Sequence, residues 1–372
     1  MLYWLYDPET PFRVLKYITF RAMMGASTAF LLTLVAGPWV IERLRRLKFG
    51  QNVRSDEVLK SHRKKAGTPT MGGLLIIGSV LVSCLLWSKP GNFFVLITLG
   101  TMLWMGGIGF LDDWIKVVKK QSKGLRARQK VILQVTWTVI AFLLLRWHPS
   151  SAPHVSKLML PFLKSPVIED MGMLLTMLFV FWVLVGSTNA VNLTDGLDGL
   201  AIGCVNASSM AYLLMTYVAG HSEFARYLQV PYVEHSGELA VFFGCLIGAG
   251  LGFLWYNCHP AKVFMGDTGS LALGGALAMG AICIKQEIAL IIVGFVFVME
   301  SASVMIQVGS FKLTGKRVFR CAPIHHHFEI LARESAERNG RDPDRIETMV
   351  VTRMWILAIV FAILGMATLK LR

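Results

Sequence analysis

Residues 173–219 read MLLTMLFVFWVLVGSTNAV, then NLTDGLDG, then LAIGCVNASSMAYLLMTYVA. Two apolar runs, each about as long as the roughly 20 residues that a membrane-spanning helix needs, enclose a polar octet, 192–199. A carboxylate at the centre of a membrane helix costs roughly 2.5–3.5 kcal/mol on insertion scales, so Asp195 and Asp198 belong at a membrane surface or in a wet cleft. A glycine after each aspartate leaves room for a ligand or metal beside the backbone. The octet therefore predicts a site between two membrane-spanning helices.

The whole chain has the composition of an integral membrane protein. Its 372 residues are 54% hydrophobic with a mean hydropathy of +0.56, which is more apolar surface than one soluble core of this length buries. The formal net charge of +14 does not indicate nucleic-acid binding, because Lys and Arg occur in blocks between apolar runs, as in the cytoplasmic loops of membrane proteins. The six cysteines show no C-x-x-C spacing, so we expect neither a disulfide framework nor a zinc site.

Ten windows are long and apolar enough to predict an all-α polytopic membrane protein, a single ten-helix domain over residues 1–372. Most of the 37 Lys and Arg residues lie in the odd-numbered connections between the windows. The positive-inside rule then places these connections in the cytoplasm and both termini on the outer, periplasmic or extracellular side. The windows are 20–41, 71–88, 93–111, 130–147, 172–191, 200–219, 239–257, 269–284, 288–310 and 353–371, and the cytoplasmic connections are about 42–70, 112–130, 192–199, 258–268 and 311–352.

The candidate acidic groups all fall on the predicted cytoplasmic side. Asp112 and Asp113 follow the third window, Asp195 and Asp198 lie in the octet, and Asp267 precedes the eighth window. For any one aspartate a solvated loop residue is an equally good explanation, but the glycine-rich, nearly uncharged surroundings of all three groups favour a site. Carboxylates with room around them suit Mg²⁺, which usually takes one or two carboxylates together with substrate phosphates.

Basic and histidine residues on the same side fit an anionic substrate. The turn 67–70 after Lys65 resembles a phosphate site at a helix N-terminus. For this stretch alone, however, the stronger explanation is that the basic residues set the membrane orientation and the turn caps the next helix. The basic stretch 116–130 fits attraction of an anionic substrate or of anionic lipid. The triple histidine 325–327 fits metal ligation, phosphate binding or acid–base chemistry; because contiguous histidines cannot easily all reach one metal ion, we favour hydrogen bonds to phosphate or sugar oxygens.

Two further segments are expected to be irregular. Residues 148–170 contain Pro149, Pro153, Pro161 and Pro166, which predicts a short hairpin or irregular loop without chemistry of its own. Residues 331–349 are charged and contain Asn-Gly and Asp-Pro pairs, so we expect a mobile cytoplasmic excursion there.

Five motifs carry a family resemblance. In their order and in the ten-span layout they resemble the phospho-N-acetylmuramoyl-pentapeptide transferases. These enzymes are a branch of the polyprenyl-phosphate N-acetylhexosamine-1-phosphate transferases, and the triple histidine distinguishes this branch from the related transferases. The resemblance covers nearly the whole chain and is weakest at 331–349, which is longer and more charged than in the family. The motifs are GTPTMGG at 67–73, DD at 112–113, NLTDGLDG at 192–199, FMGD at 264–267 and PIHHH at 323–327.

The resemblance implies an enzyme of the bacterial cytoplasmic (inner) membrane whose active site faces the cytoplasm. Such an enzyme transfers phospho-MurNAc-pentapeptide from UDP-MurNAc-pentapeptide to undecaprenyl phosphate, giving lipid I and UMP for peptidoglycan synthesis, with Mg²⁺ as cofactor. A homodimer is expected from the family alone. The nearest alternative is a related transferase that uses UDP-GlcNAc. An alternative of another class is a polytopic transporter, which is disfavoured because the acidic groups cluster at one face and not at the bilayer midplane.

The resemblance also implies roles for single residues. Asp267 is the expected metal ligand, with Asp112 and Asp195 as further candidates, and Asp112 or Asp113 is the candidate base. A phosphate monoester is largely dianionic at neutral pH, however, so charge cancellation matters more than a base. One direct attack and a covalent aspartyl intermediate both stay open. His325, His326 and His327 would bind the diphosphate or sugar, and the expected substrate-binding residues are Lys65, Thr70, Lys130, Asn192, Asp198, Asn257, Phe264 and Gln307.

Overall fold

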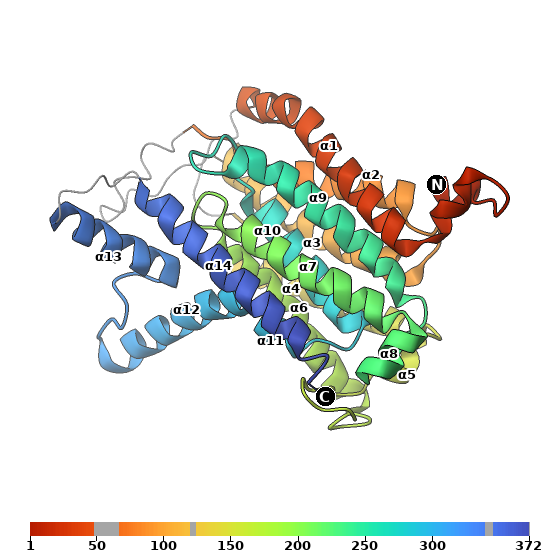
Figure 1. Ribbon diagram of the computed structural model, residues 1–372. Helices are drawn as coiled ribbons and strands as arrows, with labels where there is room; N and C mark the ends of the chain where they lie inside the picture. The colour runs from red at the N-terminus through yellow and green to blue at the C-terminus, as the bar shows by residue number, and fades with distance from the viewer. Residues whose placement is uncertain (48–66, 120–123, 339–344, 372) are drawn as a thin grey trace.

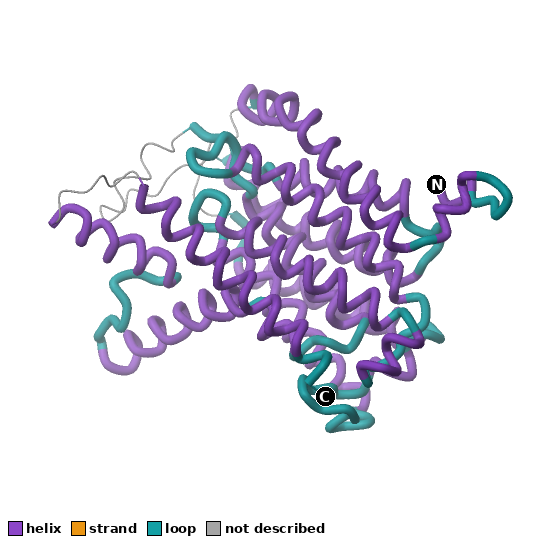
Figure 2. The backbone as a smooth tube through the Cα atoms, viewed as in Figure 1, coloured by secondary structure: helices purple, strands orange, loops and turns teal. Residues whose placement is uncertain are grey.

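The computed structural model describes residues 1–47, 67–119, 124–338 and 345–371, and in these residues the chain folds as a bundle of helices (Figures 1 and 2). The described part contains no strand, only a single antiparallel bridge. This part confirms the predicted all-α membrane class. Eight of its helices are long and apolar enough to cross a membrane: α1 (Ile18–Arg46), α3 (Phe93–Val118), α4 (Ala127–Trp147), α6 (Gly172–Thr194), α7 (Leu200–Ala219), α9 (Leu239–Asn257), α12 (Phe295–Thr314) and α14 (Ile346–Ala367).

Two shorter helices match two more of the predicted windows. α2 (Gly73–Trp87) is apolar but has 15 residues, and α10 (Gly266–Cys283) has 18 and is buried from Thr268 to its end. α10 packs against α3, α6, α2 and α7 and therefore lies inside the bundle (Figure 1). Its many Gly and Ala residues let these neighbours approach closely, as small residues do between membrane helices.

The ninth predicted window, 288–310, is not one continuous helix. It divides at Gly294, whose ψ of 25° leaves the helical region, into α11 (Ala289–Val293) and α12. Beyond this break α12 leaves the bundle at an angle (Figure 1). A break at glycine is expected where the backbone must change direction within an apolar run.

The expectation of a mobile excursion over 331–349 is wrong for its described residues. α13 (Ile324–Arg338) is a helix, and α14 already begins at Ile346, while 339–344 lie outside the described residues. Oppositely charged residues one turn apart in α13 form ion pairs, Glu329 with Arg333 and Glu334 with Arg338. The high charge of the segment thus supports a helix through i,i+4 pairs.

The two ends of the bundle differ in what they carry. α3 and α6 end, and α4 and α10 begin, at one end, which also carries Asp112, Asp113 and Asp267 and is called the acidic end below. Both chain termini lie at the other end, the terminal end (Figure 1). There the Met1 ammonium donates to Leu86 O in α2 at 3.2 Å, and Lys370 Nζ donates to Tyr227 Oη in α8 (Ser222–Leu228) at 2.6 Å.

The segment between α4 and α6 also lies at the terminal end. It contains a short helix, α5 (Ala152–Val155), followed by a hairpin in which Leu158 N donates to Ile168 O and Val167 N donates to Leu158 O, both at 2.9 Å. This arrangement confirms the predicted short hairpin within 148–170.

Candidate active site

Three carboxylates meet at the acidic end, where α3 packs against the first turn of α10. α3 continues past residue 111, the end of the predicted window, so that Asp112 and Asp113 are helical residues, and Asp267 is the second residue of α10. The two helices are closest at Gly109, where a Cβ would lie 2.1 Å from the Asp267 carbonyl oxygen. Because only glycine fits there, the aspartates one turn further along α3 lie on the same face and reach Asp267.

Asp113 fixes the start of α10. Its Oδ2 accepts hydrogen bonds from the backbone N of Thr268 at 3.0 Å and from the Thr268 hydroxyl at 2.9 Å. The first N–H groups of a helix have no partner within the helix, and a carboxylate satisfies them and interacts favourably with the helix dipole. Asp113 thus positions the helix that carries Asp267.

Two lysines balance most of the negative charge. Lys116 Nζ lies 2.6 Å from Asp112 Oδ2 and 3.2 Å from Asp267 Oδ2. Lys130 Nζ, from α4, lies 3.0 Å from Asp112 Oδ1 and 2.8 Å from Asp267 Oδ2. A buried carboxylate is costly unless it is paired and hydrogen-bonded, so the two ammonium groups allow the Asp112 side chain to be only 2% exposed.

The donor atoms of the cluster fit a divalent cation. One oxygen of each of Asp112, Asp113 and Asp267 lies within 4.8 Å of the other two, and carboxylate oxygens are the ligands that Mg²⁺ prefers. Asn192, near the end of α6, donates its Nδ2 to Asp267 Oδ1 at 2.9 Å and to Ser270 Oγ at 2.8 Å. Such a neighbour fixes the orientation of a ligating carboxylate. Asp267 therefore lies at the centre of the candidate metal centre.

Backbone pairing brings Thr70 to the same place. Phe264 N donates to Pro69 O at 2.8 Å, and Gly72 N donates to Phe264 O at 2.9 Å. A Cβ on Gly266 would lie 2.7 Å from Thr70 Oγ1, so this hydroxyl adjoins the first turn of α10. Phe264 is half-buried three residues before Asp267. Thr70, a predicted substrate-binding residue, thus borders the aspartates, and the backbone of Phe264 pairs with the segment that carries Thr70.

The last five residues of the octet, 195–199, form the turn between α6 and α7, and Asp195 is the C-cap of α6. The pKa of the Asp195 carboxyl is raised to about 8, because burial removes it from water and the negative charges of Asp267, Asp113 and Asp198 disfavour its ionisation. Asp195 is therefore close enough to the acidic cluster for the negative charge of the cluster to raise its pKa. A carboxyl with this pKa is protonated at neutral pH.

The glycine after Asp195 makes room for a histidine. A Cβ on Gly196 would lie 2.3 Å from His325 Nε2. The His325 side chain is fully buried, and its Nδ1 lies 3.0 Å from Glu300 Oε2 on α12. Among the described residues its Nε2 has no hydrogen-bond partner. A buried nitrogen without a partner costs free energy, which is typical of a group that binds a ligand.

The other two histidines have different partners. His326 Nδ1 lies 3.3 Å from Glu329 Oε2, and His327 Nδ1 accepts a hydrogen bond from Arg320 N at 3.2 Å. Successive residues of a helix point about 100° apart, and none of the metal-capable groups found in the described residues includes this triplet. The three histidines thus have three different sets of neighbours, and their expected hydrogen bonds to phosphate or sugar oxygens stay a prediction.

Known proteins match this chain over its full length. Residues 95–285 match the model of Glycosyl transferase family 4, and 65–77 match phospho-N-acetylmuramoyl-pentapeptide-transferase signature 1. Phospho-N-acetylmuramoyl-pentapeptide-transferases of three bacteria are 45–48% identical: 48% for Desulfatibacillum aliphaticivorans and 45% for Koribacter versatilis, each over 100% of both chains, and 47% for Methylacidiphilum infernorum over 96% of both. The chain belongs to the phospho-N-acetylmuramoyl-pentapeptide-transferase family. The prediction from the five motifs is thereby confirmed.

In this family member Asp198 belongs to a second group of side chains. His259 Nδ1 lies 3.0 Å from Asp198 Oδ2 and 3.4 Å from Glu347 Oε2, and Asp198 Oδ2 also accepts a hydrogen bond from Ala261 N at 3.1 Å. Asn257 joins the same segments, since its Oδ1 accepts from Gly199 N at 3.1 Å. The spacing of the three ionisable side chains would also suit a metal ion, but their hydrogen bonds already tie the octet to the segment before α10 and to α14.

Another predicted substrate-binding residue, Gln307, makes its described hydrogen bonds away from both groups of side chains. Gln307, in α12, accepts hydrogen bonds from Val318 N and Phe319 N and donates to Phe319 O, and so closes the turn after its own helix. Lys65 lies outside the described residues. A direct contact of Gln307 or Lys65 with substrate stays a prediction.

Sequence reasoning assigned no individual role to two residues of the site. Lys116 was expected only as part of a basic stretch, although its position four residues after Asp112 on one helix predicts an ion pair. Glu300 was overlooked, although a carboxylate within the apolar run that begins at Phe295 is costly and therefore indicates a buried partner. That partner is His325.

Proposed function

We propose that this chain transfers phospho-MurNAc-pentapeptide from UDP-MurNAc-pentapeptide to undecaprenyl phosphate, forming lipid I and UMP in peptidoglycan synthesis. The observation that supports the proposal, in a chain of this family, is the cluster of Asp112, Asp113 and Asp267 with Lys116 and Lys130 at one end of a membrane bundle. A polyanionic donor from solution and a phosphate at the lipid surface can both reach such a position.

We further propose ten spans in the bacterial cytoplasmic membrane, with the acidic end facing the cytoplasm. The connections rich in Lys and Arg belong to the acidic end, which favours this orientation by the positive-inside rule. α2 and α10 count as spans because a short helix is accommodated by local thinning of the bilayer, and α10 is enclosed by its neighbours.

The homodimer that the family implies stays a prediction, which light scattering of the solubilised protein tests.

The metal-binding role falls to Asp267 with Asp112, and Asp195 is the further candidate. Bound there, Mg²⁺ would supply neutralisation of the diphosphate charge. Lys116 and Lys130 already contact the same carboxylates, so their flexible side chains can turn to phosphate oxygens once a substrate is bound. In the net reaction an oxygen of undecaprenyl phosphate bonds to the sugar-linked phosphorus, and the bond from that phosphorus to UMP breaks.

The remaining residues position the substrates. Asp113 is already engaged by Thr268, so we assign it to holding α10 in place, and the largely dianionic lipid phosphate needs no strong base. His325 Nε2, buried and without a partner in the described part of the chain, is assigned a hydrogen bond to a phosphate or sugar oxygen. Thr70 borders the acidic cluster, Phe264 pairs with the same segment through its backbone, and both are assigned to the nucleotide.

UMP release tests the proposal. Purified protein is incubated with undecaprenyl phosphate, Mg²⁺ and either UDP-MurNAc-pentapeptide or UDP-GlcNAc. We expect UMP from the first donor only. Equal turnover of UDP-GlcNAc would assign the related transferase reaction, and no UMP from either donor would favour a transporter.

A matched pair of variants tests the metal assignment. We expect Asp267→Asn to lose about 100-fold or more in turnover, because the central ligand loses its charge. Asp170→Asn is the control, since the fully exposed Asp170 carboxylate accepts a hydrogen bond from Gly172 N far from the site. Normal turnover of Asp267→Asn would overturn the assignment of the metal ligand.

A further inference from the structure

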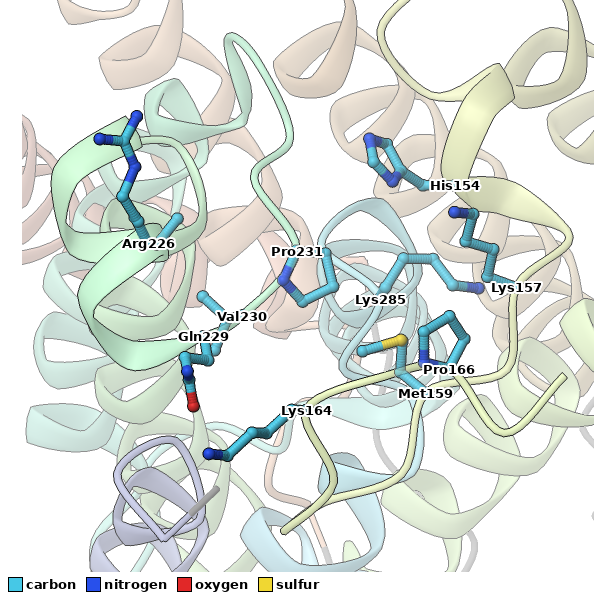
Figure 3. Close-up of a pocket in the computed structure, with 11 residues that line it drawn as sticks. His154, Lys157, Met159, Lys164, Pro166, Arg226, Gln229, Val230, Pro231 and Lys285 are labelled. Carbon is cyan, nitrogen blue, oxygen red and sulfur yellow. The ribbon is translucent and has the colours of Figure 1, made fainter. Parts of the chain in front are cut away.

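A cavity of about 440 Å³ lies at the terminal end, opposite the acidic cluster (Figure 3). It is formed by the α5 hairpin segment, by α8 with the residues that follow it, and by Lys285 after α10. α4, which has 21 residues and is about 30 Å long, begins at the acidic end beside Lys130 and ends just before α5. The cavity is therefore separate from the candidate active site.

The cavity collects basic residues from three distant connections. The connections 148–171, 220–235 and 284–288 contain four Lys and Arg residues in all, Lys157, Lys164, Arg226 and Lys285, and all four line this one cavity. None of the described residues that line it is Asp or Glu. These connections contain no other Lys or Arg, so every Lys and Arg that they supply lines this cavity.

Two of the four charges have carboxylate partners and two do not. Lys157 pairs with exposed Glu169 at 3.1 Å, and buried Lys285 pairs with Glu287 at 2.5 Å. The side chains of Lys164 and Arg226 have no carboxylate partner within the described residues, so two positive charges remain uncompensated. The pKa of His154, at the wall of the cavity, is lowered by burial and by the positive charges of Lys157 and Lys285.

The lining also has an apolar part. Figure 3 shows Met159 and Pro166 beside Lys157 and Lys285, with Val230 and Pro231 on the α8 side, while Lys164 extends toward Gln229. Met159 and Val230 are buried. A lining that combines cations with apolar side chains suits an amphiphilic anion, whose charged head contacts the cations while its apolar part covers the apolar side chains.

We propose that this cavity is a second anion site, which binds a phosphate group at the face of the membrane opposite the active site. Lys157, Lys164 and Lys285 supply point charges for the phosphate oxygens, and Arg226 at the rim adds a planar donor fork. The phosphate can belong to a lipid headgroup at the membrane surface or can be free phosphate, and the experiment below separates these sources.

Lysine labelling tests the site locally. The purified full-length protein in detergent is treated with an amine-acetylating reagent, alone and with phosphatidic acid, inorganic phosphate or phosphatidylcholine, and acetylation is measured by peptide mass spectrometry. We expect phosphatidic acid to slow acetylation of Lys164 at least threefold and to leave Lys89 unchanged. Lys89 is an exposed lysine of the same end that does not line the cavity.

The outcomes decide both the site and its source of phosphate. Protection by phosphatidic acid but not by millimolar inorganic phosphate supports a lipid headgroup, and protection by both supports a site for the phosphate group itself. Absence of protection by either, or equal protection of Lys89, would overturn the proposal.

A pair of variants provides a second measurement. In native mass spectrometry we expect Lys157→Ala/Lys164→Ala to bind phosphatidic acid at least tenfold more weakly and Lys89→Ala to bind it as the unchanged protein does. Both variants alter exposed or half-buried side chains, and unchanged UMP release verifies that they fold. Equal affinity of the two variants for phosphatidic acid would contradict the assignment.

Discussion

Replacing Gly109 by alanine is a direct test of how α3 positions the aspartates of the candidate active site. A Cβ at this position would lie 2.1 Å from the carbonyl oxygen, 2.3 Å from the carbonyl carbon of Asp267 and 2.6 Å from Thr268 N. These are backbone atoms, which cannot rotate away as a side chain can. The two helices must therefore separate locally by about 1 Å to restore ordinary van der Waals contact in a close-packed interior.

This separation acts on the site through Asp113. The two hydrogen bonds from Thr268 to Asp113 Oδ2, now 3.0 and 2.9 Å long, would lengthen to about 4 Å, beyond the range of a hydrogen bond. Misplacement by about 1 Å can cost about 100-fold in rate, and overpacking typically costs about 1–3 kcal/mol of stability. We expect Gly109→Ala to lower turnover about 100-fold while the protein still folds.

Gly107→Ala is the matched control in the same helix. A Cβ on Gly107 has no atom within 4 Å, so we expect UMP release within twofold of the unchanged protein and a stability change below about 1 kcal/mol. Both variants are assayed for UMP release and for thermal unfolding in detergent. Full turnover in Gly109→Ala, or equal losses in the two variants, would refute the reasoning that close packing of α3 on α10 positions Asp267.

Three further outcomes are expected. Asn192→Ala should raise the Mg²⁺ concentration for half-maximal UMP release about 10–100-fold, because Asp267 loses the amide that orients it; an unchanged Mg²⁺ titration would refute this. Glu300→Gln should lower turnover about tenfold and alter its pH profile, since His325 loses its charged partner; an unaltered profile would argue against a positioning role. Asp195, with its pKa raised to about 8, is protonated at pH 7, and a cation in the cluster would lower this pKa, so Mg²⁺ binding should release a proton. Calorimetry in two buffers of different ionisation enthalpy measures this release, which should be absent from Asp195→Asn, and equal heats in both buffers would exclude it.

Features set by local composition could be predicted from the sequence. Nine of the ten apolar windows each overlap one helix, and the ninth overlaps α11 and α12, because burial in lipid or in the bundle demands a continuous apolar run. Asp112 and Asp267 could be assigned to one site, because carboxylates avoid the bilayer core and both lie beyond the apolar runs on the same predicted side. The helix bounds were less accurate: α3 and α6 continue into the polar residues, since a helix does not end where hydrophobicity ends.

Features set by tertiary contact could not be predicted. In the sequence, the glycine after Asp195 is equally consistent with a turn that leaves room for a ligand. Only the structure shows that His325 packs against Gly196. From the sequence, Gln307 is expected to be a polar residue within a membrane span. In the structure its amide binds the backbone of the turn that follows α12, and this contact depends on where α12 ends. The cations of the second cavity lie in three connections separated by whole helices, so no sequence spacing indicates their convergence.

The enclosure of α10 has a consequence for how the protein is assembled during synthesis. The helices that α10 contacts most, α3, α6, α2 and α7, all precede it in the chain, so they are synthesised before α10. α10 carries Asp267 and many glycines, which makes it a poor candidate for independent partition into lipid. We therefore expect its insertion to rely on helices already in the bilayer, so that Asp267 joins Asp112 and Asp113 on α3 only when α10 inserts. A chain truncated before α10 would leave the Asp113 carboxylate on α3 without Thr268, whose backbone N and hydroxyl donate hydrogen bonds to it.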